Sequence, residues 1–174
     1  MRTLAPGFMM VGFCLTAMNA LAAESLDVFA GLMPGDGRCW GRSYDQAHLA
    51  AHPHQKVTSI DLSIGATPET EFSDGFYIFQ LDVALRDGTR GTASGECRWE
   101  GDDMFCGVEC DGGGIFINAP SQNDMLVDLE RIGSISMSSS CGGEEEGFAL
   151  RSGRDDKKFR LTRMLPQFCM PPEW

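Results

Sequence analysis

The chain is 174 residues long and carries 25 acidic residues against 14 lysines and arginines, a formal net charge of −11 at pH 7. Binding to nucleic acid or to anionic lipid requires a basic surface, so we expect no nucleic-acid partner. The acidity favours solubility, or the long-range attraction of a basic protein partner.

The first 23 residues have the features of a signal peptide. A single basic residue, Arg2, precedes an apolar run, and the residues ALA at 20–22 match the small-x-small pattern that signal peptidase cleaves. This run is too short to cross a bilayer, and no later stretch approaches the roughly 20 apolar residues of a membrane helix. We therefore expect removal of residues 1–23, and a single exported domain over 24–174, periplasmic or secreted, with no membrane span.

One short helix is predicted near the start of this domain. Ser43, with Gln46 three residues later, matches the capping box that begins many helices. Pro53 cannot continue a helix, since it lacks an N–H and its ring clashes with the preceding turn. These two signals predict a helix over residues 44–51.

All three histidines of the chain lie in or just after this helix. His48 and His52 are four residues apart and so lie on one side of it, with His54 beyond the proline. Imidazoles in this arrangement can bind a transition metal, although Asp45 is the only carboxylate nearby. Packing of the helix on the sheet is the other explanation for the histidines. Metal binding therefore stays an alternative function.

After residue 55 the apolar residues alternate with polar ones, which is typical of strands with one buried and one wet face. Turn signals such as Asp87-Gly88 and Gly101-Asp102 separate the runs. About eight short strands are expected, over 56–65, 75–87, 91–100, 103–110, 114–118, 124–131, 133–138 and 157–164. The predicted fold is all-β: a small antiparallel meander barrel or a sandwich, with the short N-terminal helix. Eight strands enclose enough room for side chains or one small ligand.

Of the seven cysteines, Cys14 belongs to the leader, and the even number left in an exported chain indicates disulfides. A two-residue turn at Gly101-Asp102 places Cys97 opposite Cys106, in the closer, non-hydrogen-bonded kind of pair. That spacing suits a disulfide. The remaining pairs, Cys39 with Cys169 and Cys110 with Cys141, follow only by elimination.

The same cysteine-rich run has a second interpretation. Cys97, Cys106 and Cys110 could supply three thiolates to a metal. Such a site needs reduced thiols in an oxidising compartment, and the paired C-x2-C spacing is missing. We expect disulfides here and no bound metal.

Catalytic patterns are scarce. The histidines occupy one segment, no serine stands in a G-x-S-x-G sequence, and paired cysteines are not nucleophiles. The glycine-rich DGGG lacks the lysine of a phosphate-binding loop. Carboxylates are plentiful, so an acid/base pair on the rim of a barrel stays an alternative. We expect no enzyme activity, no catalytic residue and no cofactor.

In layout, this exported, disulfide-stapled chain of short strands resembles the small bacterial barrels of the calycin kind, which include lipocalin-like binders and lysozyme inhibitors. The residues Ala93-Ser94-Gly95, followed by Trp99, are similar to the inhibitors' Ser-Gly motif before an aromatic residue. The stretch CWGRSYDQAHLAAHPHQKVTSI also resembles a segment of uncharacterised exported bacterial proteins. The resemblance implies a barrel that binds a ligand or a protein.

The predicted function is non-catalytic binding, either of a small apolar ligand inside the barrel or of another protein. The inward aromatic residues Tyr77 and Phe79, together with Trp99, are the predicted pocket lining, although the same side chains also serve as ordinary core. The alternative is inhibition of a basic hydrolase such as lysozyme, for which an acidic barrel is electrostatically suited. Metal binding by the three histidines is the third hypothesis.

Overall fold

The computed structural model describes residues 28–29, 31–69, 76–137, 147–169 and 172. The predicted signal peptide lies outside these residues. Within them the chain forms ten strands, one α-helix and one 3-10 helix. The elements in chain order are β1 (Gly37–Ser43), α1 (Gln46–Ala51), β2 (Val57–Ala66), β3 (Tyr77–Leu85), β4 (Arg90–Glu100), β5 (Asp103–Gly107), β6 (Gly114–Asn118), β7 (Asp124–Asp128), β8 (Ser134–Met137), β9 (Phe148–Arg151), β10 (Lys158–Arg163) and η1 (Pro166–Phe168).

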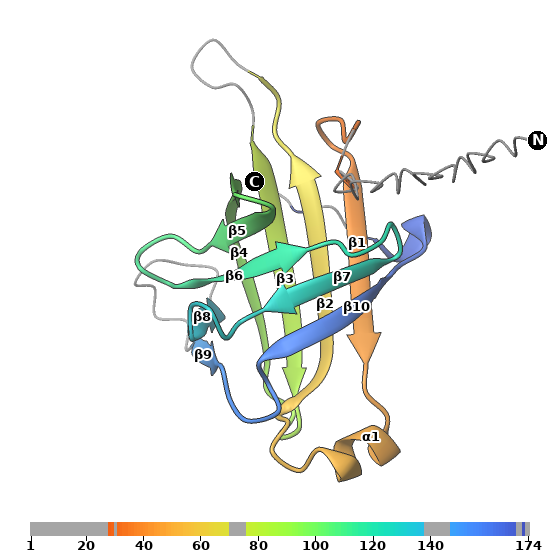
Figure 1. Cartoon of the computed structure of the whole chain (residues 1–174), viewed down its shortest axis with the longest axis vertical. Helices are drawn as coiled ribbons and strands as arrows, with labels where there is room; N and C mark the ends of the chain where they lie inside the picture. The colour runs from red at the N-terminus through yellow and green to blue at the C-terminus, as the bar shows by residue number, and fades with distance from the viewer. Residues whose placement is uncertain (1–27, 30, 70–75, 138–146, 170–171, 173–174) are drawn as a thin grey trace, which may run out of the picture.

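Eight of the strands form a closed antiparallel barrel in the order β1-β10-β7-β6-β5-β4-β3-β2. Each strand from β1 to β7 pairs with the next along the chain, and β10 closes the ring between β7 and β1 (Figure 1). Between β7 and β10 the chain makes a separate hairpin of β8 and β9. Of the two predicted architectures, the barrel is therefore confirmed.

The eight barrel strands differ from the eight predicted ones. The predicted strand 133–138 contains β8, which belongs to the hairpin, while β1 completes the barrel and was not predicted. The sequence of β1, GRCWGRS, has two glycines and two arginines and no apolar alternation. β5 and β7 both end three residues before their predicted ends, and Cys110, the last residue of the longer prediction for β5, has a φ of +57° that no strand adopts.

Helix α1 lies between β1 and β2 rather than at the N-terminal end of the fold. The predicted cap was wrong, because Ser43 is the last residue of β1 and pairs with Ser59. Asp45 caps the helix instead, its side chain accepting a hydrogen bond from the backbone N–H of His48 at 2.7 Å.

The interior of the barrel is filled by side chains that are fully buried and belong to one apolar cluster. Its largest fully buried members are Trp40, Phe79, Phe159, Ile60, Leu62, Ile64, Leu81, Met104, Ile115, Ile117, Met125 and Leu129. The β8–β9 hairpin adds Ile135, Met137 and Leu150 to the same cluster. A Cβ on Gly91, at the end of the barrel near α1, would meet Met137 and Phe148, so the hairpin closes that end.

Two predicted disulfides are confirmed. Cys97 and Cys106 are directly opposite in the β4–β5 register with Cα atoms 4.0 Å apart, and Gly101 in the turn has a φ of +69°. Cys39 of β1 is bonded to Cys169 after η1, with Cα atoms 5.4 Å apart. Cys110 is also in a disulfide, and its predicted partner, Cys141, lies outside the described residues. The three cysteines of the alternative metal site are therefore not free thiolates.

No helix in the described part of the chain is long and apolar enough to cross a membrane.

Candidate binding site at the mouth of the barrel

The strand register shows which side chains face the interior. Trp40, Leu62 and Leu81 lie in one cross-strand row of β1, β2 and β3, and all three are fully buried. Arg38 is two residues before Trp40, and Arg163 is directly opposite Trp40 on β10, so both arginines belong to the inner face. β1 begins and β10 ends at the end of the barrel away from α1 (Figure 1), and Arg38 is the second residue of β1 and Arg163 the last of β10. We call this end, with Arg38, Tyr77, Trp99 and Arg163, the mouth.

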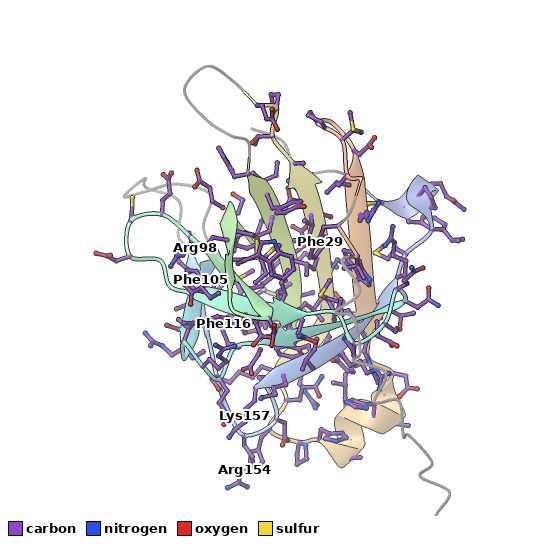
Figure 2. The ribbon with its side chains drawn as sticks, turned by 45° about the horizontal axis from the view of Figure 1, so that its top comes forward. Phe29, Arg98, Phe105, Phe116, Arg154 and Lys157 are labelled. Carbon is purple, nitrogen blue, oxygen red and sulfur yellow. A yellow bond between two sulfur atoms is a disulfide. The ribbon has the colours of Figure 1, made fainter. Side chains whose placement is uncertain are left out.

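Phe29, from the segment before β1, fills the mouth. Its side chain is only 2% exposed, and Figure 2 shows it among the side chains between the strands. The ring packs against three other aromatic rings, with centroids 6.0 Å from Trp40, 5.5 Å from Tyr77 and 6.1 Å from Trp99. Such tilted and edge-on contacts are favourable beyond the burial of the rings alone.

The three residues predicted to line a pocket have different surroundings. Tyr77 and Trp99 both contact Phe29, on the neighbouring strands β3 and β4. Tyr77 is partly buried, while Trp99 is 50% exposed at the rim. Phe79 is fully buried two residues further along β3, within the core cluster. The structure thus brings Tyr77 and Trp99 together around the Phe29 ring, and it places Phe79 apart from them in the core.

The opposite part of the mouth is cationic. The guanidinium of Arg163 lies over the Trp40 ring, 4.8 Å from its centroid, in a cation–π contact. Arg38 donates a hydrogen bond through Nη1 to the carbonyl oxygen of Val28. Burial and, second, the positive charge of Arg38 lower the pKa of Arg163, but an arginine remains protonated at neutral pH. Two positive charges, on Arg38 and Arg163, therefore lie close enough to affect each other in a chain whose net charge is strongly negative.

Trp40 contributes a polar group to the mouth. Its Nε1 is buried and has no hydrogen-bond partner among the described residues. A buried donor without an acceptor costs roughly 1–3 kcal/mol, and such groups call for an explanation such as a bound water or ligand. Because the ring contacts both Phe29 and Arg163, this donor belongs to a residue in the floor of the mouth.

The histidines form no metal-binding cluster within the described residues. The rings of His48 and His52 are stacked with centroids 4.2 Å apart. His48 Nε2 bonds to Gln55 Oε1, and His52 Nδ1 donates to the carbonyl oxygen of His48. His54 Nε2 instead accepts from Arg154, 2.9 Å away. Each histidine thus uses one ring nitrogen within the protein.

A pair of carboxylates lies on the outer wall. Asp61 and Asp82 are directly opposite on β2 and β3 and border a hollow with Ser59 and Thr92. Burial and, second, the charge of Asp82 raise the pKa of Asp61. Asp82 accepts hydrogen bonds from Gln80 and Thr92. No histidine lines this hollow, so it lacks the usual proton-transfer partner of a carboxylate.

Phe29, Arg38, Trp40 and Arg163 were all missed by the sequence-based prediction. Their sequence positions are far apart, and only the closure of β1 on β10 brings Trp40 opposite Arg163. The one local signal is the alternation of Arg38, Trp40 and Arg42, which places a large aromatic residue between two cations on one strand face.

Comparison with protein-family models, curated proteins and solved structures finds no match to this chain.

Proposed function

We propose that this chain is an exported, non-catalytic binding protein whose ligand is a small apolar molecule held at the mouth of the barrel. The observation that carries the proposal is the position of Phe29. A ring from outside the barrel strands is 2% exposed against Trp40, Tyr77 and Trp99. The mouth thus accepts an apolar group that does not belong to the barrel wall.

Export is supported by two independent features. The leader-like residues 1–23 precede the barrel, and Cys39–Cys169 and Cys97–Cys106 are disulfides, which persist in oxidising compartments. We further propose a likeness of layout to calycin barrels, supported by the closed up-and-down order of the strands.

A ligand must replace Phe29, because the interior below the mouth is filled by Trp40, Phe79 and their neighbours. Phe29 contacts the three rings, and next to it Arg38 donates a hydrogen bond to the carbonyl oxygen of Val28. The two described residues of this segment, Val28 and Phe29, belong to no strand of the barrel, so the Phe29 ring can leave without breaking the ladder between β1 and β2.

The test is saturable binding of phenylnaphthylamine, an uncharged aromatic probe that fluoresces in apolar surroundings, to the unmodified protein. We expect binding, a several-fold higher affinity in Phe29→Ala because the competing ring is gone, and a lower affinity in Trp99→Ala. Phe168→Ala is the matched control, since Phe168 is 66% exposed on η1. Absence of saturable binding to the unmodified protein would overturn the proposal, and so would equal affinities in the three variants.

A further inference from the structure

We propose that the edge of β9 away from β8 is a docking site for a protein partner, which adds an extended acidic segment as a further antiparallel strand. The site is separate from the mouth and goes beyond the proposed function. Three observations carry it: the outward-facing backbone groups of β9, a hollow beside this strand, and a local group of cations.

The register of the β8–β9 hairpin shows which backbone groups face away from β8. Ser136 and Ala149 are directly opposite, but the N–H of Ser136 bonds to the carbonyl oxygen of Gly112 and not to β9. This pair is therefore of the non-hydrogen-bonded kind, in which the N–H and C=O groups of both residues point away from the partner strand. The same holds for Arg151, two residues along β9. Within the described part of the chain, these groups of Ala149 and Arg151 have no backbone hydrogen bond.

A hollow of about 390 Å³ lies beside β9. All four residues of β9 line it, whereas its described wall includes no residue of β8; the rest of the wall comes from the end of β3, the turn after it and Lys56. Because side chains from both faces of β9 border the hollow, it lies at the edge of the strand rather than over one face. An extended segment therefore has room on the side where Ala149 and Arg151 present their backbone groups.

The lining of this hollow is positively charged. Its cations are Lys56, Arg86 and Arg151. The carboxylate among the lining residues, that of Asp87, accepts a hydrogen bond from the backbone N–H of Thr89. Arg86 donates to carbonyl oxygens. Among the residues that the structure describes, neither Lys56 nor Arg151 forms an ion pair with a carboxylate.

The contrast with other cations indicates the charge of the partner. On β10, for example, Lys158 Nζ lies 2.8 Å from a carboxylate oxygen of Asp128, which satisfies its charge. A net charge of −11 repels acidic segments from most of the surface, so such a segment is attracted only where cations gather. The charge of Arg151 also disfavours pairing with the same edge of a second copy. The edge is therefore suited to a strand of opposite charge.

The two faces of β9 determine the sequence pattern of this segment. Leu150 belongs to the core cluster and Phe148 packs against it, whereas Ala149 and Arg151 are exposed. Successive residues of an added strand point alternately to these two faces. In strand addition, main-chain hydrogen bonds give the affinity and the alternate side chains give the specificity. The segment that fits therefore alternates apolar residues, on the face of Phe148 and Leu150, with acidic residues on the face of Arg151.

The experiment measures the binding of a fluorescein-labelled peptide of alternating valine and glutamate by fluorescence anisotropy. We expect saturable binding to the unmodified protein, and none of the same peptide with lysine in place of glutamate. In antiparallel pairing, the glutamates opposite Ala149 and Arg151 are the residues whose N–H groups face β9. N-methylation of the glutamates should therefore weaken binding roughly tenfold or more. The peptide with N-methylated valines is the matched control and should bind as the unmethylated one does.

Two variants test the protein side of the contact. Arg151→Gln should weaken binding of the glutamate peptide roughly threefold, the effect of one exposed ion pair. Ala149→Pro should abolish binding, because it removes an N–H on the outward side, where an edge strand tolerates proline. Arg98→Gln is the matched control, since Arg98 is an exposed cation on β4 outside the hollow (Figure 2). If Ala149→Pro does not fold, as its melting curve shows, Arg151→Gln and the N-methylated peptides decide.

Four outcomes would overturn the inference. The first two are absence of saturable binding of the glutamate peptide and undiminished binding after N-methylation of its glutamates. The third is equal weakening by Arg98→Gln and Arg151→Gln, which would show attraction by overall charge. The fourth is displacement of the peptide by an equal concentration of free glutamate, which would show that the hollow binds a small anion and not a strand. None of these results depends on the phenylnaphthylamine experiment, because the mouth is not involved.

Discussion

The carboxylate of Asp61 shows how a single residue can oppose the stability of the fold. It lies opposite Asp82 on the outer wall, and Gly41 provides its space, since a Cβ at that position would overlap the Asp61 side chain. Burial, and then the charge of Asp82, raise the pKa of Asp61. A carboxyl group whose pKa is raised by folding favours the folded state only while it is protonated.

Asp61→Asn should therefore stabilise the protein at neutral pH, because the amide has no charge to desolvate. In the unmodified protein, the stability that comes from protonated Asp61 is lost as the pH rises from the ordinary Asp pKa of about 3.9 through the raised pKa of Asp61 in the folded state. The melting temperature of the variant should exceed that of the unmodified protein at pH 7, and the difference should vanish below about pH 3.9. A difference that is the same at both pH values would show that the charge is not its cause.

At the scale of elements, one side chain from outside the helix connects α1 and the residues after it to the barrel. Arg86, which follows β3, donates through Nη2 to the carbonyl oxygens of Leu49 and His52 at 2.6 and 2.9 Å, and through Nε to that of Gln55. The carbonyl oxygens of Leu49 and His52 are among the groups that a helix leaves without intrahelical partners at its C-terminal end. None of the residues within α1 is buried, so its position depends on polar contacts of this kind.

Arg86→Met keeps the apolar stem and removes the three hydrogen bonds. We expect a loss of about 1 kcal/mol in the free energy of unfolding, with faster amide hydrogen exchange confined to α1 and the residues up to Gln55. Arg90→Met is the matched control, since Arg90 is exposed and lies at the start of β4. Unchanged exchange in α1 would contradict this role of Arg86.

Strand prediction succeeded where the information was local. A two-residue turn sets the β4–β5 register, so Cys97–Cys106 follows from counting along the chain. β1 was missed because its burial comes from partners far away: Trp40 is enclosed by β10 and by Phe29, and Cys39 is covered by its bond to Cys169. The mouth could not be predicted for the same reason, since its groups come from β1, β3, β4 and β10 and from the segment before them.

At the scale of the whole molecule, the two disulfides constrain very different lengths of chain. Cys39 and Cys169 are separated by 130 residues, whereas Cys97 and Cys106 are separated by 9. In a chain-entropy treatment, a cross-link stabilises by restricting the unfolded chain, more so for a longer loop. The first corresponds to about 5 kcal/mol and the second to about 2.6 kcal/mol in that treatment.

Replacement of Cys39 and Cys169 by serine should therefore lower the free energy of unfolding by about 2 kcal/mol more than replacement of Cys97 and Cys106. Urea denaturation of the two double variants measures the difference. If the short hairpin disulfide proves the more stabilising of the two, constraint of the unfolded chain is not what governs their contributions.

Closure of the barrel also determines where a second chain can add a strand. Each of the eight barrel strands has a hydrogen-bonded neighbour on both sides, so none of them is an edge strand of the kind that templates association. In the hairpin, the side of β8 away from β9 is engaged as well, because Ser136 N–H bonds to the carbonyl oxygen of Gly112. Of the strands described, β9 alone has a side on which no backbone hydrogen bond or bridge to a neighbouring segment is described. It is four residues long and ends in the exposed Arg151, and short, charged edges of this kind resist intermolecular β-sheet formation.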